Sequence, residues 1–224
     1  MEQKKLMNVP NILSLVRMVL VPFCIASILY TPTIFKSVAL KNYSLYVWLV
    51  CLIPIAIFGI TSLTDMLDGK IARKYNLITN FGKFIDPLAD KFMVFGMLIA
   101  ILCANQYASI RGAFVWVSAI VMLRELGVTS LRLVVASKGV VVAASLWGKL
   151  KTVTQIASLI IILLEPAVIQ YFPGPAGNSF SILYDGHLIA CLAMAAIIVT
   201  TVGSGVDYHK QLWPYVAEKE SDKE

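Results

Sequence analysis

The stretch Thr64–Asp90, TDMLDGKIARKYNLITNFGKFIDPLAD, decides the fold because it places four aspartates at the edges of two apolar segments. Asp65 and Asp68 are three residues apart, and Asp86 and Asp90 are four residues apart, so each pair shares one face of a helix. The short segment between the pairs predicts two antiparallel helices joined by a loop. We therefore expect the four carboxylates to lie close together.

Four neighbouring carboxylates would repel one another and would disfavour their own ionisation. Divalent cations remove that conflict, and oxygen-only ligands select hard ions such as Mg²⁺ or Mn²⁺. The pattern therefore predicts a site for two divalent cations that holds a diphosphate. The alternative is a solvated loop with charged helix ends. The cost of placing charges at the edge of a membrane favours the metal site over that alternative.

Small residues accompany the aspartates at fixed spacing. Gly69 lies one turn after Asp65, and Ala72 lies one turn after Asp68, so neither adds bulk on the face that a ligand would approach. Gly82 precedes Asp86 by four residues and is expected to leave room for a facing helix. Arg73, the residue after Ala72, can pair with phosphate oxygens.

The composition is that of a polytopic membrane protein. Hydrophobic residues make up 58% of the chain and charged residues 14%, whereas a soluble globular chain carries about 25% charged residues. The net charge of +6 is explained more simply by basic loops near anionic lipid heads than by binding to nucleic acid. We therefore expect an all-α polytopic membrane protein with no nucleic-acid partner.

Six apolar segments are each close to the roughly 20 residues that a membrane-spanning helix needs. They cover about residues 12–30, 45–63, 84–105, 112–136, 150–169 and 180–203. The second is expected to continue as helix to Arg73. Residues 1–224 are expected to form a single membrane domain, with a short interfacial segment over 1–11 and a polar tail over 210–224.

Lysine and arginine are unevenly distributed between the two sides of this six-span arrangement. Most of them fall on the side of the two termini and of the loop within Thr64–Asp90, and few fall on the other side. Basic residues favour the cytoplasmic side. We therefore expect a multi-pass protein of the cell (inner or plasma) membrane, with both termini and the aspartate motif facing the cytoplasm.

The motif in Thr64–Asp90 resembles the signature of the CDP-alcohol phosphotransferases, and all of its fixed positions match. Three further stretches are similar to the phosphatidylglycerophosphate synthase branch of that family: NVPNILSLVRMVLVPF (Asn8–Phe23), RELGVTSLR (Arg124–Arg132) and GKLKT (Gly148–Thr152). The resemblance implies a six-helix fold, a homodimer and two divalent cations. It also implies transfer of the phosphatidyl group from CDP-diacylglycerol to sn-glycerol 3-phosphate, which gives phosphatidylglycerophosphate and CMP in phospholipid biosynthesis.

The resemblance assigns roles to individual residues. It implies that Asp65, Asp68 and Asp86 hold one metal, that Asp65, Asp86 and Asp90 hold the other, and that Asp90 is the general base. Residues that it places in the CDP-lipid site are Gly69, Arg73 and Thr79, with Asn11, Ser14 and Arg17 from the first helix. Asn11 and Ser14 also fit an ordinary helix start. Arg17 lies inside an apolar segment, which argues against a purely structural role.

The acceptor site is expected to be basic because glycerol 3-phosphate is a dianion near neutral pH. Candidates in or beside the fourth and fifth predicted spans are Arg124, Arg132, Lys149 and Lys151. Arg124 and Arg132 are eight residues apart, which places them within roughly 80° on a helical wheel. Glu125 is a candidate partner for one of them. The alternative, strongest for the two lysines, is that these side chains extend to the membrane surface.

Two other functions compete with this interpretation. A sister enzyme of the same family would share the aspartates and use serine, inositol phosphate or phosphatidylglycerol as acceptor. A metal- or proton-coupled transporter would also carry membrane carboxylates, but such transporters commonly contain internal repeats. No repeat is evident in this sequence.

Overall fold

The computed structural model describes the backbone of residues 8–75, 79–140, 145–171 and 187–217. Side chains are described for the same residues except 65–74, 80, 83, 170 and 171. The chain divides into two compact units. The first unit comprises Met1–Ser109 with Leu163–Tyr184, and the second comprises Ile110–Ile162 with Asp185–Glu224.

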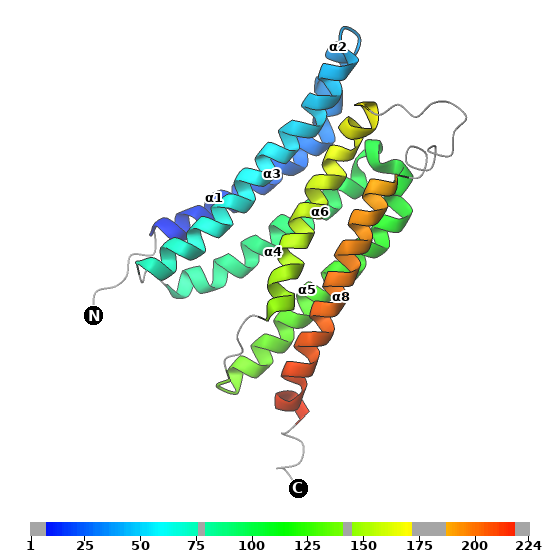
Figure 1. Cartoon of the computed structure of the whole chain (residues 1–224). Coiled ribbons are helices and arrows are strands. Elements are labelled where there is room, and N and C mark those ends of the chain that lie inside the picture. Colours follow the sequence, from blue (N-terminus) through cyan, green and yellow to red (C-terminus); the bar gives the residue numbers. More distant parts are fainter. Residues whose placement is uncertain (1–7, 76–78, 141–144, 172–186, 218–224) are drawn as a thin grey trace. The chain divides into compact units, whose positions relative to one another are not determined.

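The first unit is built around its first helix (Figure 1). Helix α1 (Val9–Ile34) packs against α3 (Tyr43–Lys74) and against α4 (Asn80–Cys103), and the short α2 (Lys36–Ala39) joins α1 to α3. The 3₁₀ segment η1 (Asn105–Ile110) follows α4. Because α1 contacts both neighbours, its side chains can meet residues from either half of the aspartate motif.

Local sequence explains where these helices begin. The Asn8 side chain accepts a hydrogen bond from the Asn11 backbone N–H at 3.1 Å, and Pro10 fits the first turn, where no intrahelical donor is needed. Thr79 caps α4 in the same way, because its hydroxyl accepts from the Gly82 N–H at 3.0 Å. The caps therefore fix the start of α1 and α4, two of the three helices that carry the first-unit candidates.

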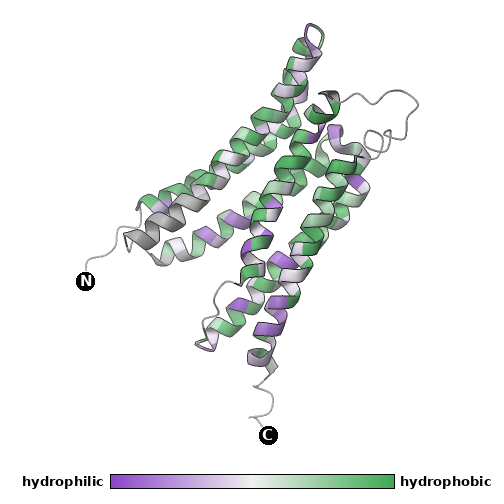
Figure 2. Ribbon diagram, viewed as in Figure 1, coloured by the Kyte–Doolittle hydropathy of each residue, from purple (hydrophilic) through white to green (hydrophobic). Residues whose placement is uncertain are grey.

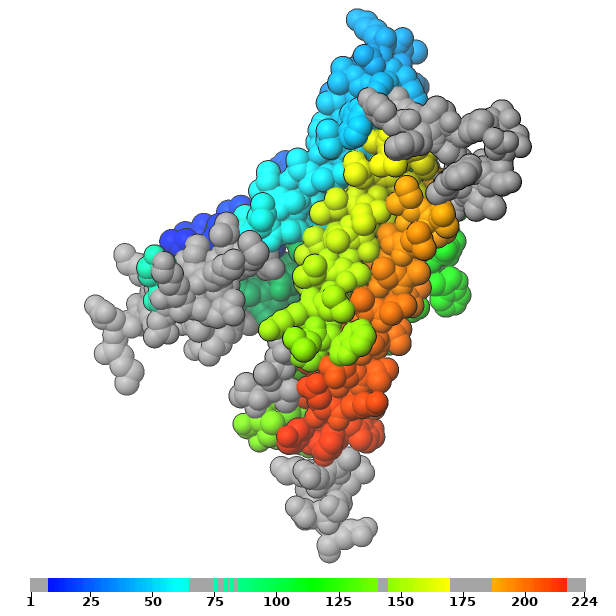
Figure 3. Space-filling model, viewed as in Figure 1, coloured from blue at the N-terminus to red at the C-terminus, as the bar shows by residue number. Residues whose placement is uncertain are grey.

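The second unit contains α5 (Arg111–Ser137), the N-terminal part of α6 (Leu146–Tyr171) and α8 (Leu188–Ala217). Helix α5 packs against α8, and their contact is built on Val128 and Val135 from α5 and Tyr208 and Leu212 from α8. Tyr208 is the one residue of these four whose side chain carries a polar group. In the space-filling view, α8 and the N-terminal part of α6 lie side by side on the visible face of this unit (Figure 3).

Five helical segments of the described chain are long and apolar enough to cross a membrane. They are Val9–Ile34, Tyr43–Thr64, Asn105–Ser137, Leu146–Ile169 and Leu188–Val216. Hydrophobic residues cover most of their length in Figure 2. The chain is therefore an all-helical multi-pass membrane protein throughout its described part.

The remaining predicted span, 84–105, coincides with α4, which is also long enough to span. It differs from the other five because Asp86, Asp90 and Lys91 lie in its N-terminal half. The predicted continuation of the second span to Arg73 is confirmed, since α3 ends at Lys74.

Helix extends into both of the predicted terminal segments. Helix α1 starts at Val9, before the predicted end of the interfacial segment at residue 11, because its cap lies at Asn8. Helix α8 continues to Ala217, so the first residues of the predicted polar tail are helical. The helix continues through Pro214 for three further residues. The predicted start of the last span, at residue 180, falls outside the described residues.

Candidate functional site

The first candidate site lies on α4, where Asp86 and Asp90 project one turn apart. Asp86 is partly buried, and the Asp90 side chain is 53% exposed. Carboxylates are acceptors with about four lone-pair positions each, so one protein hydrogen bond leaves capacity for a cation or for a substrate proton. Both groups are therefore chemically suited to the metal-binding and proton-accepting roles that the sequence predicts.

Helix α1 presents a row of three polar side chains to α4. Asn11 Nδ2 donates to the Thr79 hydroxyl at 2.9 Å, and Ser14 Oγ donates to Asp86 Oδ1 at 2.5 Å. One turn further, Arg17 Nη1 donates to Asp90 Oδ1 and forms an ion pair with it.

The three α1 residues are buried, with Ser14 and Arg17 fully so. Their spacing of three residues places them on one helical face. The row from Asn11 to Arg17 thus fixes the orientation of both α4 carboxylates. Ser14 and Arg17, for which the sequence predicted contacts with the CDP-lipid, therefore also contact the carboxylates of Asp86 and Asp90.

Gly82 makes this contact between α1 and α4 possible. A Cβ atom at this position would lie 2.7 Å from Asn11 Oδ1 and 3.2 Å from Thr79 Oγ1. Real Cβ atoms do not approach other atoms so closely, so any larger residue would force Asn11 away from Thr79. Gly82 therefore leaves room for α1, whereas the helix that the sequence predicted to face it is the one that carries Asp65 and Asp68.

The other half of the motif lies on the C-terminal part of α3. Asp65, Asp68, Gly69 and Arg73 belong to this helix, but their side chains fall outside the described residues. Among the described side chains, no group of three or more His, Cys, Asp or Glu could hold a metal ion. The proximity of the four carboxylates therefore remains a prediction. On α4, Asp86 and Asp90 are the oxygen ligands available to the predicted metal site.

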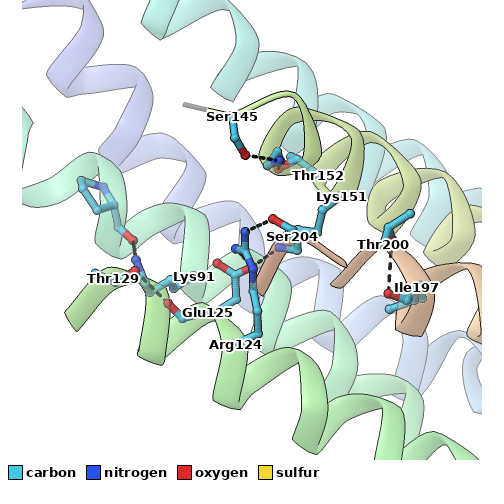
Figure 4. Close-up of polar contacts among 12 residues, drawn as sticks. Lys91, Arg124, Glu125, Thr129, Ser145, Lys151, Thr152, Ile197, Thr200 and Ser204 are labelled. Carbon is cyan, nitrogen blue, oxygen red and sulfur yellow. Dashed lines mark hydrogen bonds and ion pairs between the residues drawn. The ribbon is translucent and has the colours of Figure 1, made fainter. Parts of the chain in front are cut away.

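The second candidate site lies within the second unit, where side chains from three helices converge (Figure 4). Lys151 from α6 pairs with Glu125 from α5, whose Oε1 also lies 3.3 Å from Arg124 Nη1. Arg124 Nη2 donates to the Ser204 hydroxyl on α8. Glu125 therefore pairs with Arg124, which was one of its two predicted partners, and also with Lys151.

The structure distinguishes the two lysines of the predicted acceptor site. Lys151 is 4% exposed, so it does not extend to the membrane surface, and its charge is held by Glu125 instead. Lys149 is exposed, which is compatible with either interpretation.

The two arginines share an aromatic partner. The Cζ atoms of Arg124 and Arg132 lie 5.5 and 5.2 Å from the centroid of the Tyr208 ring. Both distances are within the range of a cation–π interaction. The predicted common face of the two arginines is confirmed by this shared contact.

Sequence reasoning missed the contribution of α8 to this cluster. Thr201, Ser204 and Tyr208 occur at positions i, i+3 and i+7 of an apolar helix, and all three are buried. That spacing defines one polar stripe on a membrane helix, where polar side chains face protein neighbours in preference to lipid. The stripe was thus a readable signal for Ser204 and Tyr208, which meet the arginines of α5.

Comparison with known proteins places the whole arrangement in context. The family model described as CDP-alcohol phosphatidyltransferase matches residues 7–203, which includes residues of both units. CDP-diacylglycerol–glycerol-3-phosphate 3-phosphatidyltransferase of Bacillus subtilis (strain 168) is 36% identical over 214 residues, covering 92% of this chain and 95% of the relative.

Two further relatives are similar over nearly the same extent. A probable phosphatidylglycerophosphate synthase of Mycobacterium tuberculosis (strain H37Rv) is 35% identical over 204 residues, covering 91% of this chain and 81% of the relative. CDP-diacylglycerol–glycerol-3-phosphate 3-phosphatidyltransferase of Rickettsia felis is 34% identical over 209 residues, covering 93% of this chain and 97% of the relative.

Proposed function

The chain belongs to the CDP-alcohol phosphatidyltransferase family, and from this premise we propose that it transfers the phosphatidyl group of CDP-diacylglycerol to sn-glycerol 3-phosphate. The products are phosphatidylglycerophosphate and CMP. The names of the relatives support this reaction. The structural observation that carries the choice of acceptor is the cation cluster of the second unit, in which Arg124 and Arg132 share the Tyr208 ring.

The aspartates are proposed as the metal ligands. Asp65, Asp68 and Asp86 would hold one divalent cation, and Asp65, Asp86 and Asp90 would hold the second, with Mg²⁺ or Mn²⁺ as the expected ions. When bound, such cations neutralise the diphosphate and stabilise the charge on the leaving CMP. The hydrogen bond from Ser14 and the ion pair from Arg17 would keep Asp86 and Asp90 oriented for these roles.

Asp90 is proposed as the general base. Its carboxylate would accept the proton of the acceptor hydroxyl while that oxygen forms a bond to the lipid-side phosphorus. The bond between this phosphorus and the oxygen of CMP breaks in the same transfer. The exposure of Asp90 suits a group that must meet an incoming substrate, and its ion pair with Arg17 holds one of its carboxylate oxygens in place.

The CDP-lipid site is proposed to include Gly69, Arg73 and Thr79 with the α1 residues Asn11, Ser14 and Arg17. Thr79 and Asn11 bond each other at the start of α4, so a ligand contact with either would be coupled to the α4 cap. The acyl chains of the donor can remain in the bilayer during the reaction. Catalysis would rest mainly on positioning and electrostatics.

The acceptor phosphate is proposed to bind Arg124, Arg132, Lys149 and Lys151. Arg124 is anchored by Ser204 and Glu125, while Arg132 is exposed and can meet a ligand from water. Anchored guanidinium groups lose less freedom when they bind an anion. A dianionic acceptor is favoured by this arrangement over a neutral one.

We further propose that both termini face the cytoplasm of the cell membrane and that the protein is a homodimer. The excess of Lys and Arg on one side of the predicted spans supports the orientation. Single cysteines, introduced after removal of the native ones, test it in intact cells. An impermeant thiol reagent should reach position 177 and should not reach position 219, and the reverse pattern would exclude this topology.

An acceptor screen on the purified protein tests the proposed reaction. CDP-diacylglycerol is supplied with glycerol 3-phosphate, serine, inositol phosphate or phosphatidylglycerol, and release of labelled CMP is measured. We expect turnover with glycerol 3-phosphate above all others. Turnover with serine alone would replace this function by that of a sister enzyme, and no CMP release with any acceptor would favour a transporter.

A variant sharpens the test of the acceptor site. Loss of one charge-assisted hydrogen bond in Arg132→Ala should lower kcat/KM for glycerol 3-phosphate roughly 10- to 150-fold, with the KM for CDP-diacylglycerol unchanged. Lys138→Ala is the matched control, because Lys138 is a basic residue of the same unit that bonds the Tyr215 carbonyl at the end of α8. Equal losses in the two variants would place the acceptor site elsewhere.

A further inference from the structure

Tyr208 joins the elements of the second unit that carry the candidate acceptor ligands. Its ring lies under the guanidinium groups of both Arg124 and Arg132 from α5. Its hydroxyl oxygen accepts a hydrogen bond from the Ser145 backbone N–H at 3.2 Å, at the start of α6. One side chain, 3% exposed, therefore contacts the two helices on which all four candidate cations are carried.

The start of α6 is built to accept this contact. The Ser145 hydroxyl caps the helix by accepting from the Gly148 N–H at 3.0 Å. A Cβ atom at Gly148 would lie 2.8 Å from the Tyr208 hydroxyl oxygen, so the absence of a side chain there lets the tyrosine approach the helix. The position of Tyr208 is thus fixed at its hydroxyl end as well as by burial.

Placing two guanidinium groups on one ring has an electrostatic cost. Like charges repel, and each arginine must be attracted by the ring strongly enough to remain close to the other. An anion bound between such cations would reduce their repulsion. The ring therefore holds two cations in place before the anion arrives, which lowers the ordering cost of binding.

We infer that Tyr208 is a positioning residue for the anionic acceptor: its ring orients Arg124 and Arg132 toward the acceptor phosphate without touching the substrate. This inference rests on the proposed function, in which those arginines bind glycerol 3-phosphate. It extends that function to a residue on α8 and identifies a determinant of acceptor affinity that does not carry charge.

Substitutions at position 208 separate the ring from the hydroxyl. Tyr208→Leu removes two cation–π contacts and should raise the KM for glycerol 3-phosphate about 5- to 30-fold. Tyr208→Phe keeps the ring and should leave that KM close to the wild-type value. The KM for CDP-diacylglycerol and kcat should not change in either variant. Tyr215→Leu, which removes an exposed tyrosine two turns further along α8, is the matched control and should behave as wild type.

A series that preserves side-chain volume keeps the test decisive if Tyr208→Leu does not fold. Phenylalanine and its mono-, di- and trifluorinated forms are incorporated at position 208, because fluorine weakens the attraction of the ring for cations. We expect the KM for glycerol 3-phosphate to rise stepwise with fluorination. A flat series, or a Tyr208→Phe variant as impaired as Tyr208→Leu, would overturn the inference. Absence of glycerol 3-phosphate turnover in the wild-type protein would instead overturn the proposed function.

Discussion

Replacing Arg17 by methionine removes the cation that holds Asp90 and keeps an apolar stem of similar length. Arg17 is fully buried, whereas Asp90 is 53% exposed. Breaking a fully buried ion pair costs about 3–5 kcal/mol because the remaining charge has no partner. Water can reach Asp90, so that figure is an upper limit here. The relevant quantity is one charge-assisted hydrogen bond, about 1.5–3 kcal/mol.

If Arg17 acts by orienting Asp90, this loss should appear in the proton-transfer step. If that is its only role, Arg17→Met should lower kcat roughly 10- to 150-fold and leave the KM for CDP-diacylglycerol unchanged; if Arg17 also contacts the CDP-lipid, as proposed above, that KM should rise as well. CMP release by the purified protein is measured while each substrate is varied in turn. Ser14→Ala should give a smaller effect of the same kind through Asp86. Ser27→Ala is its control, because Ser27 bonds only the Cys24 carbonyl of its own helix among the contacts described for it.

The outcome separates two roles for Arg17. A normal kcat with a raised KM for CDP-diacylglycerol would refute the orienting role and favour the direct lipid contact that the sequence resemblance implies. Thermal unfolding in detergent is recorded for each variant, so that a loss of folded protein is not counted as a loss of catalysis. Arg17→Lys keeps the charge without the planar guanidinium and should give an intermediate kcat.

Three further predictions test the proposed sites. EDTA should abolish CMP release and added Mg²⁺ or Mn²⁺ should restore it, and full turnover in metal-free buffer would exclude the two-metal site. Asp90→Asn keeps an oxygen that can accept from Arg17 but is not a base, so kcat should fall by a factor of about 10² or more while CDP-lipid binding is retained; near-normal kcat would exclude Asp90 as the base. Lys151→Met should lower the thermal stability in detergent because it leaves Glu125 with less compensation, and adding Glu125→Gln should recover part of that loss. Equal stability of the single and double variants would argue against the importance of this ion pair.

The long helices could be predicted because membrane spans follow a simple physical rule. Apolar segments of sufficient length must satisfy their backbone hydrogen bonds internally, so they form helices. The helix through Arg73 and the positions of α5 and α6 follow from this rule. The division into two units could not be predicted, because it depends on which helices pack together, and lipid-facing and protein-facing residues are similarly apolar.

The contacts between α1 and α4 could not be predicted from the sequence motif. The family resemblance implied that Asn11, Ser14 and Arg17 contact the CDP-lipid, but it did not predict which protein groups they contact. Their alignment with Thr79, Asp86 and Asp90 depends on the start of α4 and on the close approach that Gly82 allows. Both are tertiary features. Charged and polar residues in an apolar segment could therefore be singled out as candidate site residues, while their protein partners required the structure.

The acceptor cluster adds a constraint that the list of basic residues lacked. Glu125 neutralises Lys151, which explains how a lysine can be 4% exposed in an apolar helix. The four candidate cations Arg124, Arg132, Lys149 and Lys151 together with the Glu125 carboxylate carry a formal charge of +3. A dianionic phosphate would compensate most of that charge, whereas a zwitterionic acceptor such as serine would leave all of it uncompensated. Glu125 thus lowers the positive charge of the cluster but leaves it cationic, which the proposed anionic acceptor requires.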